Sequence, residues 1–287
     1  MNQNMKNKLL MWLAISIVIS IIKIFFSQRN SVVEEPFTAH HFVILMLCIT
    51  FGWLKKDAIL SQMNNEGMLA EQSYVVAGVF IAVISLLMPL SSNLAFVVFT
   101  VFLIFTGMFM VFFGAAAYLP SLLVFVYGFS VSFPKIFDGA IGTQYALITT
   151  KIVAYFSSLV YPVGFEGQLL YLTDAAGSSS LVFIDVGCSG SASLAIFLTV
   201  FALMLIDVRP RNDRILPLFL FGILGTSVQN IFRLLLLVAT NYHFGSVAMW
   251  KMHDNAGYVL FPVWFMIFIY VYLKAAGKQH TGTDYPK

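Results

Sequence analysis

The chain has 287 residues, of which 60% are hydrophobic and only 10% are charged, and its mean hydropathy is +0.88. Soluble domains carry about 25% charged residues, so this composition excludes an ordinary globular protein in water. The net charge of +3 is small. Because the basic residues lie at the ends of apolar segments, they indicate membrane topology and not nucleic acid as a partner.

Apolar runs close to the ~20 residues that cross a bilayer recur along the chain. We therefore predict an all-α polytopic membrane protein with about eight transmembrane helices, built as one integral-membrane domain over residues 1–287. The expected helices cover residues 9–26, 36 or 37 to 54, 74–90, 94–113, 116–133, 191–206, 215–240 and 256–273. The first is expected to be retained, because it contains no small-residue cleavage site.

Basic residues predict which ends of these helices face the cytoplasm. Lysines before residue 9 and in the tail 274–287 place both termini inside, and Lys55 and Lys56 open a polar loop, 55–72, that is also expected inside. The segment 207–214 carries three arginines and is the clearest cytoplasmic loop. Since the chain crosses the membrane between such loops, the start of the helix over 191–206 is expected at the outer face.

The segment from 134 to 187 is expected to be extracytoplasmic and to differ in character from the helices around it. Residues 140–160 mix polar and apolar side chains and predict an amphipathic helix lying along the bilayer. Residues 168–173 and 181–186 are short β-prone runs on either side of a turn-rich stretch, which predicts a hairpin. This hairpin leads directly to Cys188.

Cys188 lies between Gly187 and Gly190 at the start of an apolar helix. The positive partial charge of a helix N-terminus lowers a thiol's pKa and favours the nucleophilic thiolate. The flanking glycines would let a substrate backbone approach closely. The alternative is a small apolar residue in a tight turn. The second cysteine, Cys48, lies within an expected span, so a disulfide is not expected.

Arg233 lies inside an expected transmembrane helix, where an arginine costs at least ~2.5 kcal/mol and is functional by default. Ser227, Asn230 and Arg233 follow each other at helical spacing and form one polar stripe. A guanidinium there could hold a carbonyl oxygen or a developing oxyanion. The alternative is a structural ion pair. Its candidate partners are the acids before Cys188: Asp138, Glu166, Asp174 and Asp185.

His253 lies just before the last helix, at the expected outer face. Imidazole titrates near neutrality, and a helix N-terminus tends to keep it neutral and able to act as a base. The alternative is an interfacial histidine without a role. The spacing of Cys188, His243 and His253 does not fit a zinc site, so neither a metal nor another cofactor is expected.

The order Gly187-Cys188-Ser189-Gly190, Asn230-x-x-Arg233 and His253-x-x-x-Gly257-x-x-x-Phe261 resembles the exosortase/archaeosortase family of membrane cysteine transpeptidases. The resemblance covers mainly residues 138–271. It implies Cys188 as nucleophile, Arg233 as transition-state stabiliser and His253 as general acid/base. The positions it implies as substrate-binding or supporting are Ser189, Gly190, Asn230 and Gly257.

The resemblance also implies partners and a location. Substrates would be membrane-anchored proteins ending in a sorting signal, which is a short motif, a transmembrane helix and a basic cluster. Cleavage would occur at the extracytoplasmic face of the cell (inner/cytoplasmic) membrane, with transfer to a lipid or surface acceptor. Three alternatives stay open: a transporter or channel with an anion path along Arg233, a non-catalytic assembly factor, and an acyltransferase that uses the same cysteine.

Overall fold

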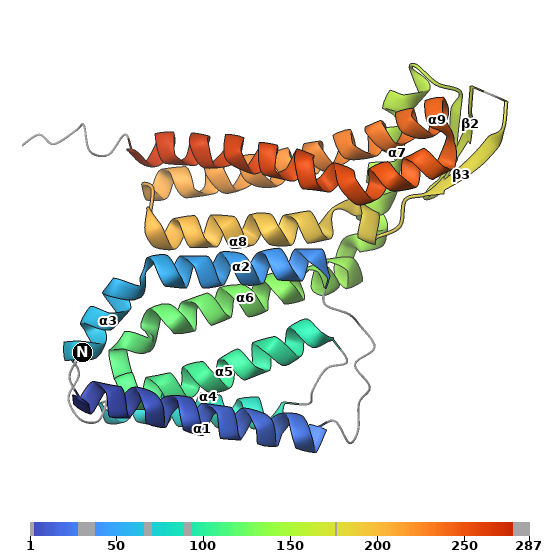
Figure 1. Cartoon of the computed structure of the whole chain (residues 1–287). Helices are drawn as coiled ribbons and strands as arrows, with labels where there is room; N and C mark the ends of the chain where they lie inside the picture. Colours follow the sequence, from blue (N-terminus) through green and yellow to red (C-terminus); the bar gives the residue numbers. More distant parts are fainter. Residues whose placement is uncertain (1–2, 28–37, 66–70, 89–92, 176, 278–287) are drawn as a thin grey trace, which may run out of the picture. The chain divides into compact units, whose positions relative to one another are not determined.

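A computed structural model describes the whole chain except residues 1–2, 28–37, 66–70, 89–92, 176 and 278–287 (Figure 1). The chain forms two compact units, Met1–Val131 and Ser132–Lys287. The boundary lies beside Pro134, where the sequence changes from uninterrupted apolar runs to mixed character.

The first unit consists of helices. They are α1 (Gln3–Ser27), α2 (Ala39–Leu54), α3 (Lys56–Asn65), α4 (Gln72–Leu87), α5 (Leu94–Phe113), the 3₁₀ turn η1 (Gly114–Ala117) and most of α6 (Tyr118–Phe137). Each of the five apolar segments expected before residue 134 contains a helix, although the expected helical residues 36–37 and 89–90 lie outside the described residues. The helix predicted over 94–113 is confirmed with the same bounds.

Helix α3 corrects the prediction that residues 55–72 form a polar loop. Its residues Ile59 and Met63 are one helical turn apart, and Met63 is buried. Both pack in a cluster with Met5 and Phe113. The polar residues between them lower the average hydropathy of the segment, so hydropathy alone did not predict this helix. Tertiary packing of its short apolar face stabilises it.

Small side chains and one lysine bring the helices of this unit together. A Cβ added to Gly78 on α4 would lie 2.5 Å from the carbonyl oxygen of Gly107 on α5, so both glycines permit close backbone approach. On α1, buried Lys23 donates through Nζ to the carbonyl oxygens of Leu86, at 2.8 Å, and Met88. The lysine thereby satisfies carbonyls at the end of α4 that have no partner within the helix.

The second unit combines a small sheet with long helices. After α6 come the π-helical turn η2 (Asp138–Gly142), α7 (Thr143–Ser158), β1 (Val163–Glu166), β2 (Leu169–Thr173), β3 (Ser179–Phe183), the 3₁₀ turn η3 (Gly187–Ser189), α8 (Ser191–Asp207) and α9 (Asn212–Gly277). The predicted hairpin is confirmed as β2 and β3, with Leu169 opposite Phe183. Strand β1, which was not predicted, completes an antiparallel sheet in the order β1-β2-β3.

Helix α7 confirms a helix within residues 140–160. An amphipathic surface helix buries its apolar face and exposes its polar one, whereas α7 buries polar side chains and exposes apolar ones. Thr149 and Thr150 are buried, whereas Ile148, Tyr155 and Phe156 are exposed. A buried threonine is tolerated because its hydroxyl can bond to the helix backbone; the Thr150 hydroxyl donates to the Ala146 carbonyl oxygen at 2.8 Å. The orientation of α7 in a membrane stays a prediction.

Helix α9 is interrupted at Gly245, whose φ of 77° and ψ of 176° are not helical. We call residues 212–244 its first arm and residues 246–277 its second arm; Figure 1 shows the two arms turning back along each other. Trp264 Nε1 on the second arm donates to Thr226 Oγ1 on the first at 3.1 Å. The helices expected over 215–240 and 256–273 are therefore both longer than predicted, because Gly245 alone makes the turn between them and its neighbours stay helical.

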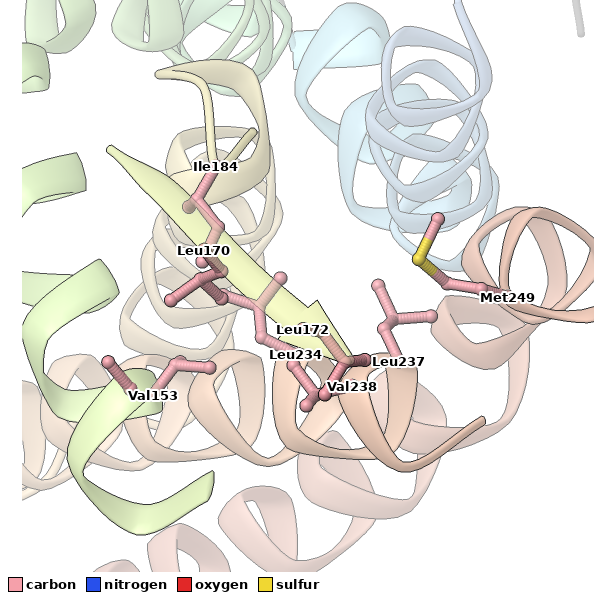
Figure 2. Close-up of a cluster of buried hydrophobic side chains, with 9 residues drawn as sticks. Val153, Leu170, Leu172, Ile184, Leu234, Leu237, Val238 and Met249 are labelled. Carbon is pink, nitrogen blue, oxygen red and sulfur yellow. The ribbon is translucent and has the colours of Figure 1, made fainter. Parts of the chain in front are cut away.

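A buried apolar cluster joins α7, the sheet and α9 (Figure 2). Its members come from distant parts of the sequence: Val153, Ala154, Leu170, Leu172, Ile184, Leu234, Leu237, Val238 and Met249. Cys188 packs against this cluster. The cluster thus fixes the segment before Cys188 relative to the first arm of α9.

Three helical stretches of the described chain are long and apolar enough to cross a membrane: Met5–Phe25, Leu94–Ser158 and Asn212–Gly277. Shorter apolar helices are Ala39–Leu54, Gln72–Leu87 and Ser191–Asp207. These stretches fit a multi-pass membrane protein. The count of eight spans and the cytoplasmic position of both termini stay predictions, and tail residues 278–287 lie outside the described residues.

Replacing Gly222 with alanine should destabilise the second unit. The added Cβ would lie 2.1 Å from the ring of Phe197, which is fully buried, and 2.9 Å from Phe268. Overpacking of this kind costs about 1–3 kcal/mol. Thermal unfolding in detergent should therefore show a lower midpoint for Gly222→Ala. Gly277→Ala in the same helix is the control, because no atom lies within 4 Å of its added Cβ; equal midpoints for the two variants would contradict the packing argument.

Candidate active site

Cys188 lies in the 3₁₀ turn η3, and its backbone is held from two sides. Its N–H donates to Asp185 Oδ1 at 2.7 Å, and its carbonyl oxygen accepts from Asn230 Nδ2 at 3.1 Å. Asn230 is almost completely buried on the first arm of α9. The bonds therefore tie the cysteine both to the segment that follows β3 and to a long helix.

Gly190 ends the turn and begins α8 with φ 109° and ψ 13°. This left-handed conformation favours glycine. The position is also crowded, since an added Cβ would lie 3.0 Å from the side-chain amide of Asn230. The structure thus gives Gly190 a structural reason for being glycine, namely that it lets the turn approach Asn230.

His253 lies on the second arm of α9 and contacts the thiol directly. Its Nε2 is 3.5 Å from Cys188 Sγ. The Nδ1 atom lies 3.6 Å from Asp254 Oδ1, which is longer than a good hydrogen bond, and the Asp254 side chain is largely exposed. The imidazole also lies beside the ring of Trp250, with 5.4 Å between the ring centroids.

Arg233 lies one helical turn beyond Asn230 on the first arm, and its charge favours the ionised form of Cys188. Its Nε atom is buried without a hydrogen-bond partner. No ion pair between Arg233 and an acid is found in the part of the chain that the structure describes. An arginine placed in this way keeps donor capacity for a group that is not part of the chain.

The thiol itself is protonated at neutral pH. Burial raises the pKa of Cys188 to about 11, the Asp185 carboxylate acts in the same direction, and the Arg233 guanidinium opposes them. This corrects the expectation that a helix N-terminus lowers the thiol's pKa. The reason is that Gly190 separates Cys188 from α8, so the sulfur packs against the apolar cluster beside a carboxylate. Formation of the thiolate therefore needs a base, and His253 is within contact distance.

Four further positions were predicted to bind substrate or to support the site, and the structure gives a role to two of them. Asn230 and Gly190 support the turn, as described above. Ser189 follows Cys188 in η3, and its side chain lies outside the described residues. Gly257 is helical, and an added Cβ would meet only the Phe261 ring at 3.5 Å, which is an ordinary contact. The structure gives no reason for glycine at position 257.

Sequence reasoning treated Asp185 only as a possible ion-pair partner and missed its bond to the Cys188 N–H. The signal was present, because an aspartate can accept a backbone hydrogen bond from a residue a few positions ahead. A second missed feature involves the polar stripe: Tyr145 Oη on α7 donates to Ser227 Oγ at 2.8 Å. A pair so distant in sequence cannot be read from local spacing.

Among the described residues, no group of three or more His, Cys, Asp and Glu side chains could hold a metal ion. The reactive groups that the structure places at the site are the Cys188 thiol, the His253 imidazole and the Arg233 guanidinium.

Replacing Asp185 with asparagine should make the Cys188 thiol more acidic. An asparagine oxygen can still accept the Cys188 N–H bond, so the turn is kept, whereas the negative charge that disfavours the thiolate is removed. The pH profile of Cys188 alkylation by iodoacetamide should move to lower pH. Glu166→Gln is the matched control, because it removes a carboxylate that bonds to Tyr171 instead. A profile that shifts equally in both variants, or in neither, would contradict this account.

Comparison with known protein families identifies a family for this chain. A family model described as transmembrane exosortase matches residues 32–270, a range that contains Cys188, Arg233 and His253. Searches of curated proteins and of solved structures returned no significant match. The match covers most of the chain and includes both the apolar helices and the candidate site. The chain belongs to the transmembrane exosortase family.

Proposed function

We propose that this protein is a membrane-embedded cysteine peptidase or transpeptidase. Its substrates are surface proteins that end in a short motif, a transmembrane helix and a basic cluster. The protein cleaves them at the extracytoplasmic face of the cell membrane and transfers them to a lipid or surface acceptor. One observation carries the proposal: the imidazole of His253 lies 3.5 Å from the Cys188 sulfur, with the charge of Arg233 favouring the thiolate.

The first step is proton transfer from Cys188 Sγ to His253 Nε2. Burial keeps the sulfur protonated until a base accepts the proton, and the base is in contact. The resulting thiolate and imidazolium form a pair of opposite charges, which stabilise each other in a partly buried site. The thiolate then attacks the scissile carbonyl carbon and forms a carbon–sulfur bond.

Arg233 stabilises the oxyanion of the tetrahedral intermediate. Its Nε–H has no partner within the described chain, so a substrate oxygen can accept from it without displacing another bond. A donor that is oriented before the reaction contributes typically 10²–10³-fold to the rate. This use of Arg233 also gives a reason for an arginine in an apolar helix.

His253 then returns its proton to the leaving amine as the carbon–nitrogen bond breaks. A thioester between Cys188 and the substrate remains, and a second nucleophile from the acceptor resolves it. A substrate helix held in the plane of the membrane arrives already oriented, which can supply several kcal/mol of the barrier.

The contacts of the polar stripe favour an enzyme over an anion path. Ser227 is hydrogen-bonded to Tyr145, and Asn230 donates to the backbone of Cys188. Two of the three stripe residues therefore serve the internal structure of the protein. An anion path would need these polar groups to face a channel.

Replacing Cys188 with alanine should abolish processing while the protein still accumulates in the membrane. The measurement is the mass shift of a co-expressed surface protein that ends in the motif, helix and basic cluster. Cys48→Ala is the matched control, since Cys48 is the other free cysteine and lies in α2. Processing that persists in Cys188→Ala at wild-type expression would rule out the covalent route.

Replacing Arg233 with alanine should lower the rate of cleavage by roughly 10²–10³-fold, the usual effect of losing one oxyanion donor. Lysine keeps the charge but not the forked donor geometry, so Arg233→Lys should retain part of the activity. The same processing assay, run as a time course, measures both variants. If Arg233→Ala cleaves as fast as the wild type, the oxyanion role is wrong.

A further inference from the structure

Strand β3 lies at an edge of the sheet and leads to the nucleophile. In the described chain the sheet order β1-β2-β3 leaves β3 with a single neighbour. Five positions separate Phe183, the last residue of β3, from Cys188, a span of at most about 17 Å between their Cα atoms. Substrate residues beside the scissile bond can therefore reach this edge.

The register of the hairpin shows which backbone groups face the open edge. Ile184 N–H donates to the Gln168 carbonyl oxygen at 3.0 Å, so Ile184 is a position that bonds toward β2. Bonding positions alternate in an antiparallel pair, which makes Val182 the next one. Leu181 and Phe183 thus direct their N–H and C=O groups away from β2. The described chain contains no hydrogen bond to these groups.

The side chains of β3 follow the same alternation. Ile184 points into the apolar cluster with Leu170 and Leu172, as Figure 2 shows. Leu181 and Phe183 lie on the other face and are 65% and 57% exposed. A strand added to this edge would place alternate side chains opposite these two large apolar residues.

The edge of β3 also lacks the features that normally prevent strand addition. Natural edge strands carry proline, charged residues or a bulge that block pairing. The other edge strand, β1, follows Pro162 and ends at Glu166. Strand β3 has the sequence Ser-Ser-Leu-Val-Phe, without proline or charge, and it pairs with β2 without a bulge. The accessible edge is thus the one next to Cys188.

We propose that the edge of β3 binds an extended segment of the substrate polypeptide, on the amino-terminal side of the cleaved bond, as an added strand. The inference rests on the proposed function, in which the other side of the cleaved bond continues into a transmembrane helix. Backbone hydrogen bonds to Leu181 and Phe183 hold the segment, and because every polypeptide offers them, they position the bond largely independently of side-chain identity.

Peptide reagents that alkylate Cys188 test this proposal on the full chain in detergent. The rates of acetyl-tetraalanine chloromethyl ketone and acetyl-alanine chloromethyl ketone are compared with that of iodoacetamide, and Cys188→Ala provides the blank. The thiolate displaces chloride, or iodide, and forms a carbon–sulfur bond. We expect the tetrapeptide to react about tenfold faster than the single residue, as expected for one or two added hydrogen bonds.

Two substitutions at one position separate the backbone from the side chain. Leu181→Pro removes the outward N–H without removing a bond to β2, whereas Leu181→Ala removes only the side chain. The tetrapeptide advantage should be lost in the proline variant and largely kept in the alanine variant. Iodoacetamide should react with both variants at the wild-type rate, because unfolding would expose the sulfur that packs against the apolar cluster and would change that rate.

A series of N-methylated tetrapeptides tests the edge on the unaltered protein. Methylation at every second residue should slow alkylation, whereas methylation between these positions should have little effect. An equal effect at all positions, or equal rates for the long and short peptides with normal iodoacetamide reactivity, overturns the added strand and leaves the nucleophile intact.

Two further outcomes would also overturn the proposal. A wild-type dimer in detergent that Leu181→Pro converts to a monomer would mean that the edge pairs with a second copy of the chain. A Cys188 that reacts with none of the three reagents would overturn the proposed function, and the added strand with it.

Discussion

The side-chain amide of Asn230 bonded to the carbonyl oxygen of Cys188 is the contact on which the site depends. It connects a short turn, which has no regular structure beyond three residues, to a helix that is part of a long hairpin. Arg233 lies one turn further along the same helix face, so the bond also sets the position of the sulfur relative to the guanidinium. Gly190 allows the bond because a larger residue would meet the amide.

Hydropathy and local turn signals were sufficient to predict most helices and the hairpin. Both are local properties, since a helix over 94–113 or a turn between β2 and β3 is determined largely by neighbours in sequence. The features that the sequence did not predict depend instead on residues that are distant in sequence. Helix α3 depends on packing against Phe113, and the buried face of α7 depends on α9 and the sheet. Neither partner can be identified from the segment itself.

The candidate site was likewise predictable only in its local features. The order of cysteine, arginine and histidine on successive helices was visible in the sequence, and the structure brings the thiol and the imidazole together. The acidity of the thiol could not be predicted, because it depends on burial against the apolar cluster and on the Asp185 carboxylate, which bonds back to the turn. The expected helix N-terminus predicted a reactive thiolate. The observed surroundings instead keep Cys188 protonated until a base accepts its proton.

Gly245 has a mechanical consequence for that base. Cys188 is bonded to the first arm of α9, whereas His253 lies eight positions beyond the glycine on the second arm, about 12 Å along a helix. A swing of roughly 10° at the hinge would displace the imidazole by about 2 Å, enough to break contact with the sulfur at the geometry that proton transfer requires. The angle is held by the Trp264–Thr226 bond further along the hairpin. The alignment of the reacting atoms therefore depends on the angle between the two arms of α9, and a contact remote from the sulfur helps to set the distance between thiol and imidazole.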